Sequence, residues 1–485
     1  MNNTTNRFFW IMLGLSLIVA FAFQGSRGLF ETTEGRYAEV AREMLDSGNY
    51  LEPTIGYRAH WTKPPLAYWT IAGGMRLLGR NEWGVRFSNA VAFVLTTWIV
   101  FHIGALLWNK RAGVMAGLVY ATSANTIFGM NSISTDTLLT LWEITAVFCY
   151  LKAGRVTTAQ NRNGWRLLMW VFFGLGFLTK GPPALLPLPA IWIWHRLSRQ
   201  KWRLFNVQGV LLFLVVALWW YLLVCFRHPE LLTYFLGTEV IARVASDSFH
   251  RNSEWYKPLA IYLPFLTVGA GVWSIYLLKV VIAKKLFRIK TIWNYLLQGT
   301  YAAFLLLWIL IPLLIFFISK SRLPLYVLPL VAPVSLIIGY GLSDGYRLKK
   351  ITIIAGISAV FLIGLKGASV YYSDKNDMKA LYAACMNLGG ANAKIASYKE
   401  HNLNGLQFYL NGNLTRLSDR KKPWSDDLAE NFIANELGKD TTVRHLFVMR
   451  PAHAEKLKGM LDRQGVTFEA HENRFWQIYV TPKKG

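Results

Sequence analysis

Two short stretches of the chain concentrate carboxylates, cations and prolines within a sequence that is otherwise strongly apolar. The first stretch, residues 31–44, reads ETTEGRYAEVAREM, and the second, residues 61–66, reads WTKPPL. Both fall between two apolar runs that are long enough to cross a bilayer. Carboxylates beside a fixed cation at a membrane surface indicate chemistry on an anionic lipid.

The composition is that of a membrane protein. Of the 485 residues, 53% are hydrophobic and only 16% are charged, which is unusual for a soluble protein of this size. The formal charge of +25 would suggest nucleic-acid binding in a soluble chain. Here the basic residues gather in short loops near 110–111, 152–166, 196–203, 284–290 and 347–350. This pattern is typical of cytoplasmic loops and argues against a nucleic-acid partner.

Apolar segments predict a mainly α, polytopic membrane helical bundle of about eleven spans. They lie near 8–24, 84–108, 112–130, 136–153, 165–179, 182–195, 206–226, 258–282, 296–318, 323–343 and 351–369. With the five basic loops in the cytoplasm, the alternate loops face outward, and an odd number of spans places the C-terminal segment outside. We expect a transmembrane domain over 1–369 and an extracytoplasmic domain over 370–485.

The first outward loop, near 25–83, is predicted to hold two amphipathic surface helices. Thr33 is the expected cap of the first and Gly48 its stop, and the second is expected to start at Pro64 and Pro65. The charged residues Glu31, Glu39, Arg42 and Glu43 are interpreted as the solvated face of the first helix.

The segment after about residue 370 has the composition of a small α/β domain. Strands are expected at 395–398, 445–449 and 475–480, and helices at 427–437 and 452–464.

Glu34 and Asp136 are the candidate catalytic acids. A carboxylate in the first turn of a helix, such as Glu34, stays ionised, which suits a general base or a stabiliser of positive charge; the alternative is an ordinary first-turn acid. Asp136 opens an expected span, where an acid costs about 3 kcal/mol unless it faces a cavity or a partner; its alternative is a helix N-cap. Glu143, deeper on the same face, is interpreted as a structural partner for Asn or Arg groups.

Several cations are expected on the outer side, against the general charge bias. They are Lys63, Lys180, Arg243, Lys320 and Arg322. Most of them lie beside Pro or Gly or at the end of a span, where a side chain can be fixed near the headgroups. Any one of them alone is explained by snorkelling. Together they would clamp a phosphate.

Five ordered blocks, spread over roughly residues 10–345, carry a family resemblance. They are TEGRYAEVAREM at 33–44, KPPLAYW at 63–69, Asp136, TKGP at 179–182 and RLPLYVLP at 322–329. The chain resembles the bacterial aminoarabinose lipid A transferases and protein O-mannosyltransferase-like glycosyltransferases. It departs from many relatives in having Thr33 immediately before Glu34, and Thr62 immediately before the Lys-Pro-Pro sequence.

The resemblance implies a GT-C fold and an inverting enzyme of the bacterial inner membrane that needs no nucleotide in its site. Such enzymes move a sugar from a polyprenyl (undecaprenyl) monophosphate to an extracytoplasmic acceptor, such as lipid A, another envelope glycan or a protein. Glu34 and Asp136 look like the acidic pair, and Lys63, Arg243 and Tyr326 like carrier-phosphate contacts. Arg36, Tyr37, Lys180, Lys320 and Arg322 are further substrate-binding candidates. Metal dependence is left open, with His250 and Glu239 as candidate ligands.

Three other functions compete with a lipid or glycan glycosyltransferase. A protein O-glycosyltransferase differs only in its acceptor. A lipid-linked sugar flippase would predict a repeat relating two halves of the chain, and the sequence has none. A noncatalytic scaffold leaves Asp136 and the outward cations unexplained.

Overall fold

The computed structural model describes residues 3–242, 252–372, 374–437 and 443–482. It divides into two compact units that we describe separately. The helical unit comprises Met1–Gln24, Trp61–Thr70 and Arg86–Gly367, and the mixed unit comprises Gly25–His60, Ile71–Val85 and Ala368–Gly485. Most of the first long loop therefore groups with the C-terminal segment. The predicted division into domains 1–369 and 370–485 stays a prediction.

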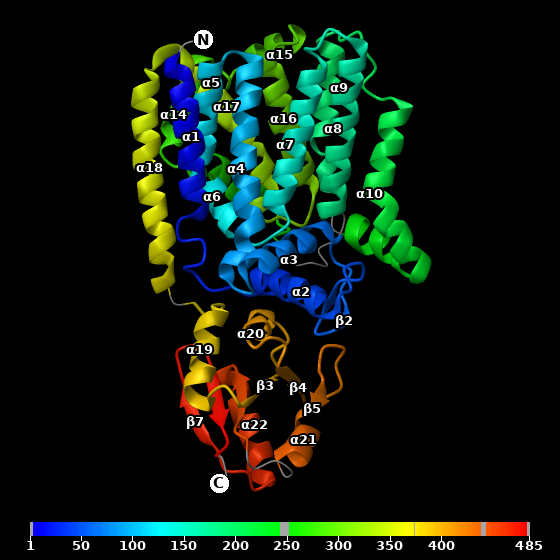
Figure 1. Ribbon diagram of the computed structural model, residues 1–485, viewed down its shortest axis with the longest axis vertical. Helices are drawn as coiled ribbons and strands as arrows, with labels where there is room; N and C mark the ends of the chain where they lie inside the picture. The colour runs from blue at the N-terminus through cyan, green and yellow to red at the C-terminus, as the bar shows by residue number, and fades with distance from the viewer. Residues whose placement is uncertain (1–2, 243–251, 373, 438–442, 483–485) are drawn as a thin grey trace. The chain divides into compact units, whose positions relative to one another are not determined.

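The helical unit is a bundle built almost entirely from α-helices (Figure 1). Its longer elements are α1 Asn3–Phe21, α4 Glu82–Leu107, α5 Lys110–Ala121, α7 Asp136–Ala153, α8 Ala159–Lys180, α9 Pro187–Leu197, α10 Val207–Arg227, α13 Lys257–Leu266, α14 Trp273–Ala283, α16 Tyr301–Ile318, α17 Val331–Gly345 and α18 Leu348–Ala368. Shorter helices include α6 Ala124–Asn131, α11 Leu231–Thr233, α15 Ile289–Leu297 and a 3-10 helix over Pro324–Leu330.

Every predicted span contains helix, but the count of about eleven is not confirmed. Within the described residues, six helices are long and apolar enough to cross a membrane, or seven if the α13 and α14 segments, bent by 104° at their junction, form one span. The predicted span at 112–130 is broken between α5 and α6. The helix α7 carries three charged residues, Asp136, Glu143 and Lys152, and α9 has only 11 residues.

The helices α7 and α8 pack closely enough to fix the ends from which functional side chains project. A Cβ atom added at Gly176 of α8 would lie only 2.9 Å from the Ala184 Cβ, so glycine is needed where Ala184 packs on α8, and it would lie in ordinary contact, 3.5 Å, from the Trp142 Cβ of α7. The indole Nε1 of Trp142 also donates to the Thr179 hydroxyl at 3.1 Å. These contacts hold the start of α7 beside the end of α8.

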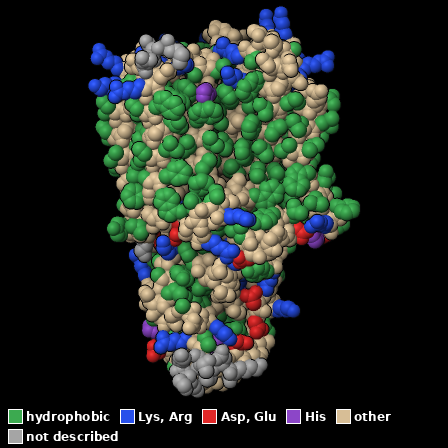
Figure 2. Space-filling model, in the orientation of Figure 1, with side chains coloured by type: hydrophobic (Ala, Val, Ile, Leu, Met, Phe, Trp, Pro, Cys, Tyr) green, Lys and Arg blue, Asp and Glu red, His purple; other side chains and the backbone are tan. Residues whose placement is uncertain are grey.

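The five basic loops meet at one end of the helical unit. In Figure 1 the connections from α4 to α5, α7 to α8 and α9 to α10 all lie at the upper end, and Figure 2 shows Lys and Arg side chains gathered there. The helix α7 runs from Asp136 at the opposite end to Lys152 near the basic one. The sequence pattern and the fold therefore agree on the polarity of the bundle.

The mixed unit contains a six-stranded sheet in the order β5-β4-β3-β6-β8-β7. Its strands are β3 Lys394–Tyr398, β4 Leu414–Ser418, β5 Asp427–Leu428, β6 His445–Met449, β7 Glu469–Glu472 and β8 Gln477–Val480. Neighbours from β5 to β6 pair in parallel, and β8 pairs antiparallel with both β6 and β7. Its helices are α19 Met378–Gly389, α20 Asn404–Tyr409, α21 Ala429–Phe432 and α22 Pro451–Arg463. The predicted α/β domain is confirmed, although the expected helix at 427–437 begins as the short strand β5.

The first long loop contributes the helix α2 Thr33–Ser47 and a hairpin to this unit. The hairpin consists of β1 Thr54–Ile55 and β2 Arg58–Ala59, and α3 Leu66–Leu78 follows it in the chain. Gly48 ends α2 with a φ of 69°, as predicted. The expected Thr33 cap is wrong, because Thr32 holds the N-cap position without a side-chain hydrogen bond and Thr33 is the first helical residue.

Candidate active site

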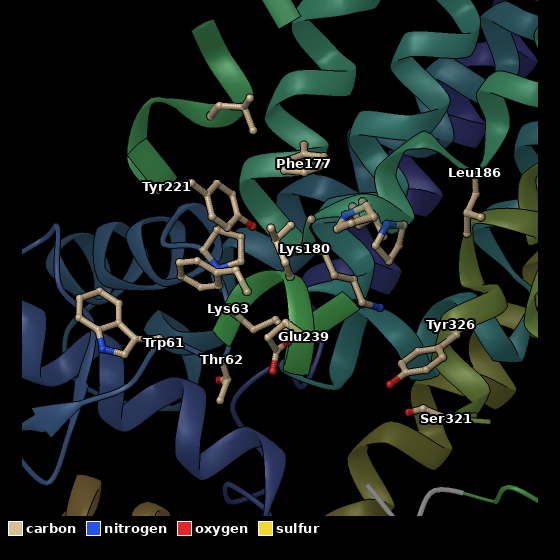
Figure 3. Close-up of a pocket in the computed structure, with 18 of the residues that line it drawn as sticks. Trp61, Thr62, Lys63, Phe177, Lys180, Leu186, Tyr221, Glu239, Ser321 and Tyr326 are labelled. Atoms are coloured by element: carbon tan, nitrogen blue, oxygen red, sulfur yellow. Dashed lines mark hydrogen bonds and ion pairs between the residues drawn. The ribbon is translucent and has the colours of Figure 1, made fainter. Parts of the chain in front are cut away.

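A pocket of about 620 Å³ opens in the helical unit at the end where α7 begins and α8 ends (Figure 3). Most of its lining is apolar, and the helices α8, α10 and α16 contribute Phe177, Leu218, Leu222 and Phe316 to it. The polar lining residues are Thr62, Lys63, Glu143, Lys180, Tyr221, Glu239, Ser319, Ser321 and Tyr326. The size and the mainly apolar lining are typical of a small-molecule or lipid site.

Lys180 stands at the C-terminal end of α8 because Gly181, with a φ of 84°, stops the helix directly after it. A cation in the last turn is favoured by the helix dipole. Its Nζ forms an ion pair with Oδ1 of Asp136, the first residue of α7. The ammonium also lies 4.5 Å from the ring centroid of Tyr326, within the range of a cation–π interaction. The structure therefore brings Lys180, Asp136 and Tyr326 together.

Lys63 forms the second charged pair of the pocket. Its Nζ lies 3.2 Å from Oε2 of Glu239, and the hydroxyl of Tyr234 donates to Oε1 of the same carboxylate at 3.2 Å. The two side chains keep 15% and 13% of their surface exposed. Lys63 precedes Pro64, whose fixed backbone holds the lysine at the start of α3. Glu239 thus acts as the partner of Lys63 in this structure.

The pocket therefore combines a long apolar wall with two ammonium groups, each paired with a carboxylate. An amphiphile with a phosphate at one end and a hydrocarbon chain at the other is complementary to this arrangement. The apolar wall would take the chain, and the ammonium groups would exchange their carboxylates for phosphate oxygens.

Arg322 and Lys320 do not line this pocket. The Arg322 guanidinium is buried and donates to the backbone carbonyls of Asn252, Glu254 and Phe317, at 2.8, 2.9 and 3.0 Å. It ties the turn after α16 to the segment before α13. Lys320 is exposed on the same turn. Arg243 and His250, predicted as a phosphate contact and a metal ligand, lie outside the described residues.

Glu34 lies in the mixed unit, in the first turn of α2. Its Oε1 accepts from Nη2 of Arg27 at 2.7 Å, and its Oε2 accepts from the backbone N–H of Phe30 at 3.0 Å. The carboxylate is 7% exposed. Both contacts are charge-assisted hydrogen bonds to the carboxylate. The neighbouring Tyr37 is buried, and the Arg36 guanidinium lies 5.6 Å from the centre of its ring.

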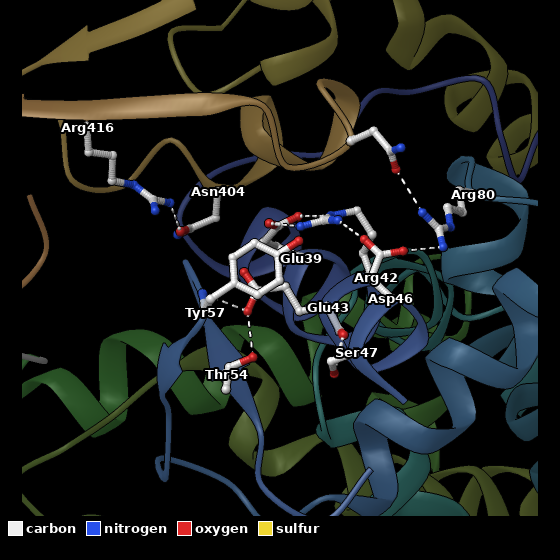
Figure 4. A network of polar contacts seen from close by, with 11 residues as sticks. Glu39, Arg42, Glu43, Asp46, Ser47, Thr54, Tyr57, Arg80, Asn404 and Arg416 are labelled. Atoms are coloured by element: carbon white, nitrogen blue, oxygen red, sulfur yellow. Dashed lines mark hydrogen bonds and ion pairs between the residues drawn. The ribbon is translucent and has the colours of Figure 1, made fainter. Parts of the chain in front are cut away.

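The interpretation of Glu39, Arg42 and Glu43 as a solvated helix face is wrong, because all three are fully buried. Arg42 donates from Nε and Nη2 to the two oxygens of Glu39, both at 2.7 Å, and pairs through Nη1 with Asp46 (Figure 4). Glu43 accepts from the hydroxyl of Thr54 at 2.6 Å. The hairpin and the C-terminal segment cover the polar side of α2, which the helical periodicity alone could not reveal.

Glu31 is the fourth residue that we had assigned to the solvated face of the first surface helix, and it is half-buried. Its Oε1 accepts from the backbone N–H of Gly405 at the start of α20. Burial raises the pKa of Glu31 to about 7, against the lowering effect of this hydrogen bond and of the charges of Arg36 and Arg416.

Sequence reasoning underestimated Glu143 and Tyr221. The expected Asn or Arg partner of Glu143 is absent among the described residues, and its Oε1 has no hydrogen-bond partner there. Both residues line the pocket. The sequence does contain a signal for Glu143, because it follows Asp136 by seven residues and so lies on the same face of the helix.

The metal question stays open. In the described part of the chain, no group of three or more His, Cys, Asp and Glu side chains could hold a metal ion. Glu239 is occupied by Lys63 and Tyr234, so the described side chains offer no ligand set that fits a divalent ion.

The helical unit, with its pocket at the end of α8, has the GT-C fold of membrane glycosyltransferases. The whole chain matches the crystal structure of ArnT from Cupriavidus metallidurans bound to undecaprenyl phosphate, over 97% of each chain, with a TM-score of 0.79 at 18% identity. This likeness shows the fold.

Sequence comparisons confirm the resemblance carried by the five motif blocks. Residues 62–226 match the family described as dolichyl-phosphate-mannose-protein mannosyltransferase. Undecaprenyl phosphate-alpha-4-amino-4-deoxy-L-arabinose arabinosyl transferase 2 of Pseudomonas fluorescens is 31% identical over 350 residues, which cover 70% of this chain and 60% of that protein. The protein of the same name from Proteus mirabilis is 28% identical over 385 residues, which cover 75% of this chain and 66% of that protein. The chain thus spans less than two thirds of the length of both relatives.

Proposed function

We propose that this chain is an inverting membrane glycosyltransferase that moves a sugar from a polyprenyl (undecaprenyl) monophosphate to an extracytoplasmic acceptor such as lipid A or another envelope glycan. The observation that carries the proposal is the pocket, where Lys63 and Lys180 stand at one end of an apolar wall. Similarity to the arabinosyl transferases of Pseudomonas fluorescens and Proteus mirabilis supports the same donor class.

The proposed reaction is a single displacement at the anomeric carbon. The acceptor oxygen forms a bond to that carbon while the bond to the phosphate oxygen breaks, and the polyprenyl phosphate leaves with the electron pair. Lys63 and Lys180 would stabilise the charge on the leaving phosphate. If the acceptor is a hydroxyl, Glu34 or Asp136 takes its proton. If the acceptor is a phosphate, no base is needed and the carboxylates orient the sugar.

Asp136 has a second proposed role, because its carboxylate pairs with Lys180. Binding of the donor phosphate would draw Lys180 away from this partner and leave an Asp136 oxygen available. Arg243, Lys320, Arg322, Tyr326, Arg36 and Tyr37 stay proposed as substrate contacts. For Arg322, whose guanidinium holds three backbone carbonyls, a positioning role is better supported by its contacts.

The proposed location is the bacterial inner membrane, with the pocket end of the bundle facing the periplasm. The gathering of basic loops at the opposite end supports this orientation. A cysteine placed at Lys320, next to the pocket end, should react with a membrane-impermeant thiol reagent in intact spheroplasts, whereas a cysteine placed at Lys201 should react only after lysis. The reverse pattern would overturn the orientation.

The test of the function is transfer by the purified full chain. With a polyprenyl-phosphate sugar as donor and a lipid A acceptor, we expect a glycosylated lipid that mass spectrometry detects. Absence of transfer from every polyprenyl-phosphate sugar would refute the proposal.

Protein O-glycosylation is the second candidate, favoured by the match of residues 62–226 to the dolichyl-phosphate-mannose-protein mannosyltransferase family. Mass analysis of a deletion strain separates the two. Loss of a sugar from lipid A or another glycan supports the first function, and loss of sugar from envelope proteins supports the second.

A further inference from the structure

The connection between α14 and α16 carries a surface that the proposed function does not use. Its centre is α15 Ile289–Leu297, a helix of 9 residues, which is far shorter than the roughly 20 residues that cross a bilayer. The helix lies at the upper end of the bundle in Figure 1, together with the basic loops. This end is opposite to the one where α7 begins and the pocket opens.

One side of α15 packs on the bundle, and another side is open. Tyr295 and Leu296 pack against the main hydrophobic core. Ile289, Trp293 and Leu297 follow one another at a spacing of four residues, so they form a stripe along the helix. These three side chains are 61–80% exposed. An apolar stripe on a short helix at the end of a bundle is typical of a segment that lies in the membrane interface.

Four exposed cations accompany this stripe, and they are Lys284, Lys285, Arg288 and Lys290. The sequence has no acidic residue between Glu254 and Asp344, so the segment has no carboxylate of its own to neutralise them. In another basic loop, by contrast, Arg155 and Arg166 donate to the backbone carbonyls of Leu106 and Arg203. The cations near α15 are thus placed to meet a partner from outside the chain.

The start of α15 favours an anion as that partner. Arg288 holds the N-cap position, and no side chain caps the helix there. Lys290 is the second residue of the helix. The positive end of the helix dipole disfavours cations at this place, whereas the free N–H groups of a first turn and nearby cations both attract an anion.

We infer that α15 and the cations before it form a binding surface for anionic phospholipids, with the headgroup phosphate at the cations and Trp293 and its neighbours among the acyl chains. The inference is independent of the proposed glycosyl transfer. Each lysine or arginine close to an anionic membrane surface adds attraction, and insertion of the stripe removes apolar surface from water. A zwitterionic phospholipid offers the same chains without the net charge.

The wild-type chain alone provides the first test. Native mass spectrometry of the purified full chain in neutral detergent compares phosphatidylglycerol with phosphatidylcholine of the same acyl chains. We expect the first phosphatidylglycerol to bind at least about tenfold more tightly. Raising ammonium acetate from about 0.1 to about 0.5 M should lower this preference, because salt screens exposed charges. Equal binding of the two lipids would overturn the inference.

A triple variant tests the cations. Lys284→Gln, Arg288→Gln and Lys290→Gln together should lower the preference for phosphatidylglycerol at least about fivefold. Thermal unfolding in detergent checks that this variant is folded. An unchanged preference would overturn the inference.

A matched triple variant removes the same charge from another basic loop. Arg347, Lys349 and Lys350 are exposed, but no exposed apolar side chain lies among residues 346–352. Arg347→Gln, Lys349→Gln and Lys350→Gln together should change the preference less than about twofold. Equal losses in the two triple variants would show a general effect of net charge and would overturn the assignment to α15.

Trp293→Ser tests the apolar stripe. The change removes an indole but no charge, so both lipids should bind at least about threefold more weakly, while the preference for phosphatidylglycerol is kept. Unchanged affinity for both lipids would show that α15 does not insert among the acyl chains and would contradict the inference.

Discussion

The pocket of the helical unit and the buried network of the mixed unit use the same residue types in different ways. In the pocket, Lys63 is partly exposed and pairs with the carboxylate of Glu239. In the network, Arg42 has no exposed side-chain surface and is held between Glu39 and Asp46. A cation that the pocket leaves accessible can exchange its carboxylate for a ligand phosphate, whereas an enclosed guanidinium cannot. Charge density in a motif therefore does not identify the site; access to the charged group does.

The largest expected effect tests the pocket side of this comparison. Asp136→Asn and Glu34→Gln should each lower kcat for transfer from a polyprenyl-phosphate sugar by about 10²- to 10⁴-fold, because each removes a proposed acid–base or positioning carboxylate. Glu430→Gln, at an exposed acid of the C-terminal segment, is the control and should keep wild-type activity. Full activity in both Asp136→Asn and Glu34→Gln, with wild-type yield and thermal stability, would refute their assignment.

The next effect tests the network side. Arg42→Ala should lower the free energy of unfolding by about 3–5 kcal/mol, because it leaves the Glu39 carboxylate buried without its partner. Thermal unfolding in detergent measures the change. Arg80→Ala is the matched control, since Arg80 is 39% exposed and pairs with the same Asp46; its cost should stay below about 1 kcal/mol. Similar costs for both variants would contradict the distinction drawn above.

Stability of the mixed unit should depend on pH through Glu31. Its pKa is raised from 4.5 to about 7 in the folded protein, so the folded state binds more protons than the unfolded state between these values. The contribution of Glu31 to stability should therefore be greatest below pH 4.5 and fall as the pH rises to about 7, by up to about 3 kcal/mol. Glu39, whose pKa burial also raises to about 7, adds a dependence of the same sign. Glu31→Gln should reduce the slope of stability against pH, in unfolding curves taken at several pH values, by the share that Glu31 contributes. An unaltered pH profile would show that other groups control it.

The smallest expected effect distinguishes a pocket lysine from a surface lysine. Lys63→Ala should raise KM for the polyprenyl-phosphate donor by about 10- to 50-fold, through loss of a charge-assisted contact made before the bond breaks, with kcat changed less. Lys201→Ala removes an exposed lysine of a basic loop, outside the pocket lining, and should raise KM less than about threefold. Equal effects in steady-state kinetics would mean that the pocket lysine has no special role.

Much of the fold could be predicted from the sequence because its signals are local. Apolar runs and basic loops predicted the helices and their polarity, and Gly48 marked the end of α2 as its left-handed conformation requires. The strands at 395–398 and 445–449 followed from their β-branched and aromatic residues. The number of spans was less predictable, since helix breaks such as that between α5 and α6 depend on packing.

The sequence by itself determined the residue types of the candidate site. Lys63, Lys180, Asp136 and Tyr326 were all chosen from motifs, and the structure gathers Lys180, Asp136 and Tyr326 in one place. The sequence could not determine which side chains pair with each other, because paired residues are far apart in the chain. Lys63, for example, pairs with Glu239, 176 residues further along.

Only the tertiary structure separated buried charges from accessible ones. Glu39 and Arg42, which helical periodicity had assigned to solvent, are buried in the structure, and Glu143 lines a pocket. The physical reason is that burial depends on what other segments cover a side chain, and local sequence carries no record of those segments.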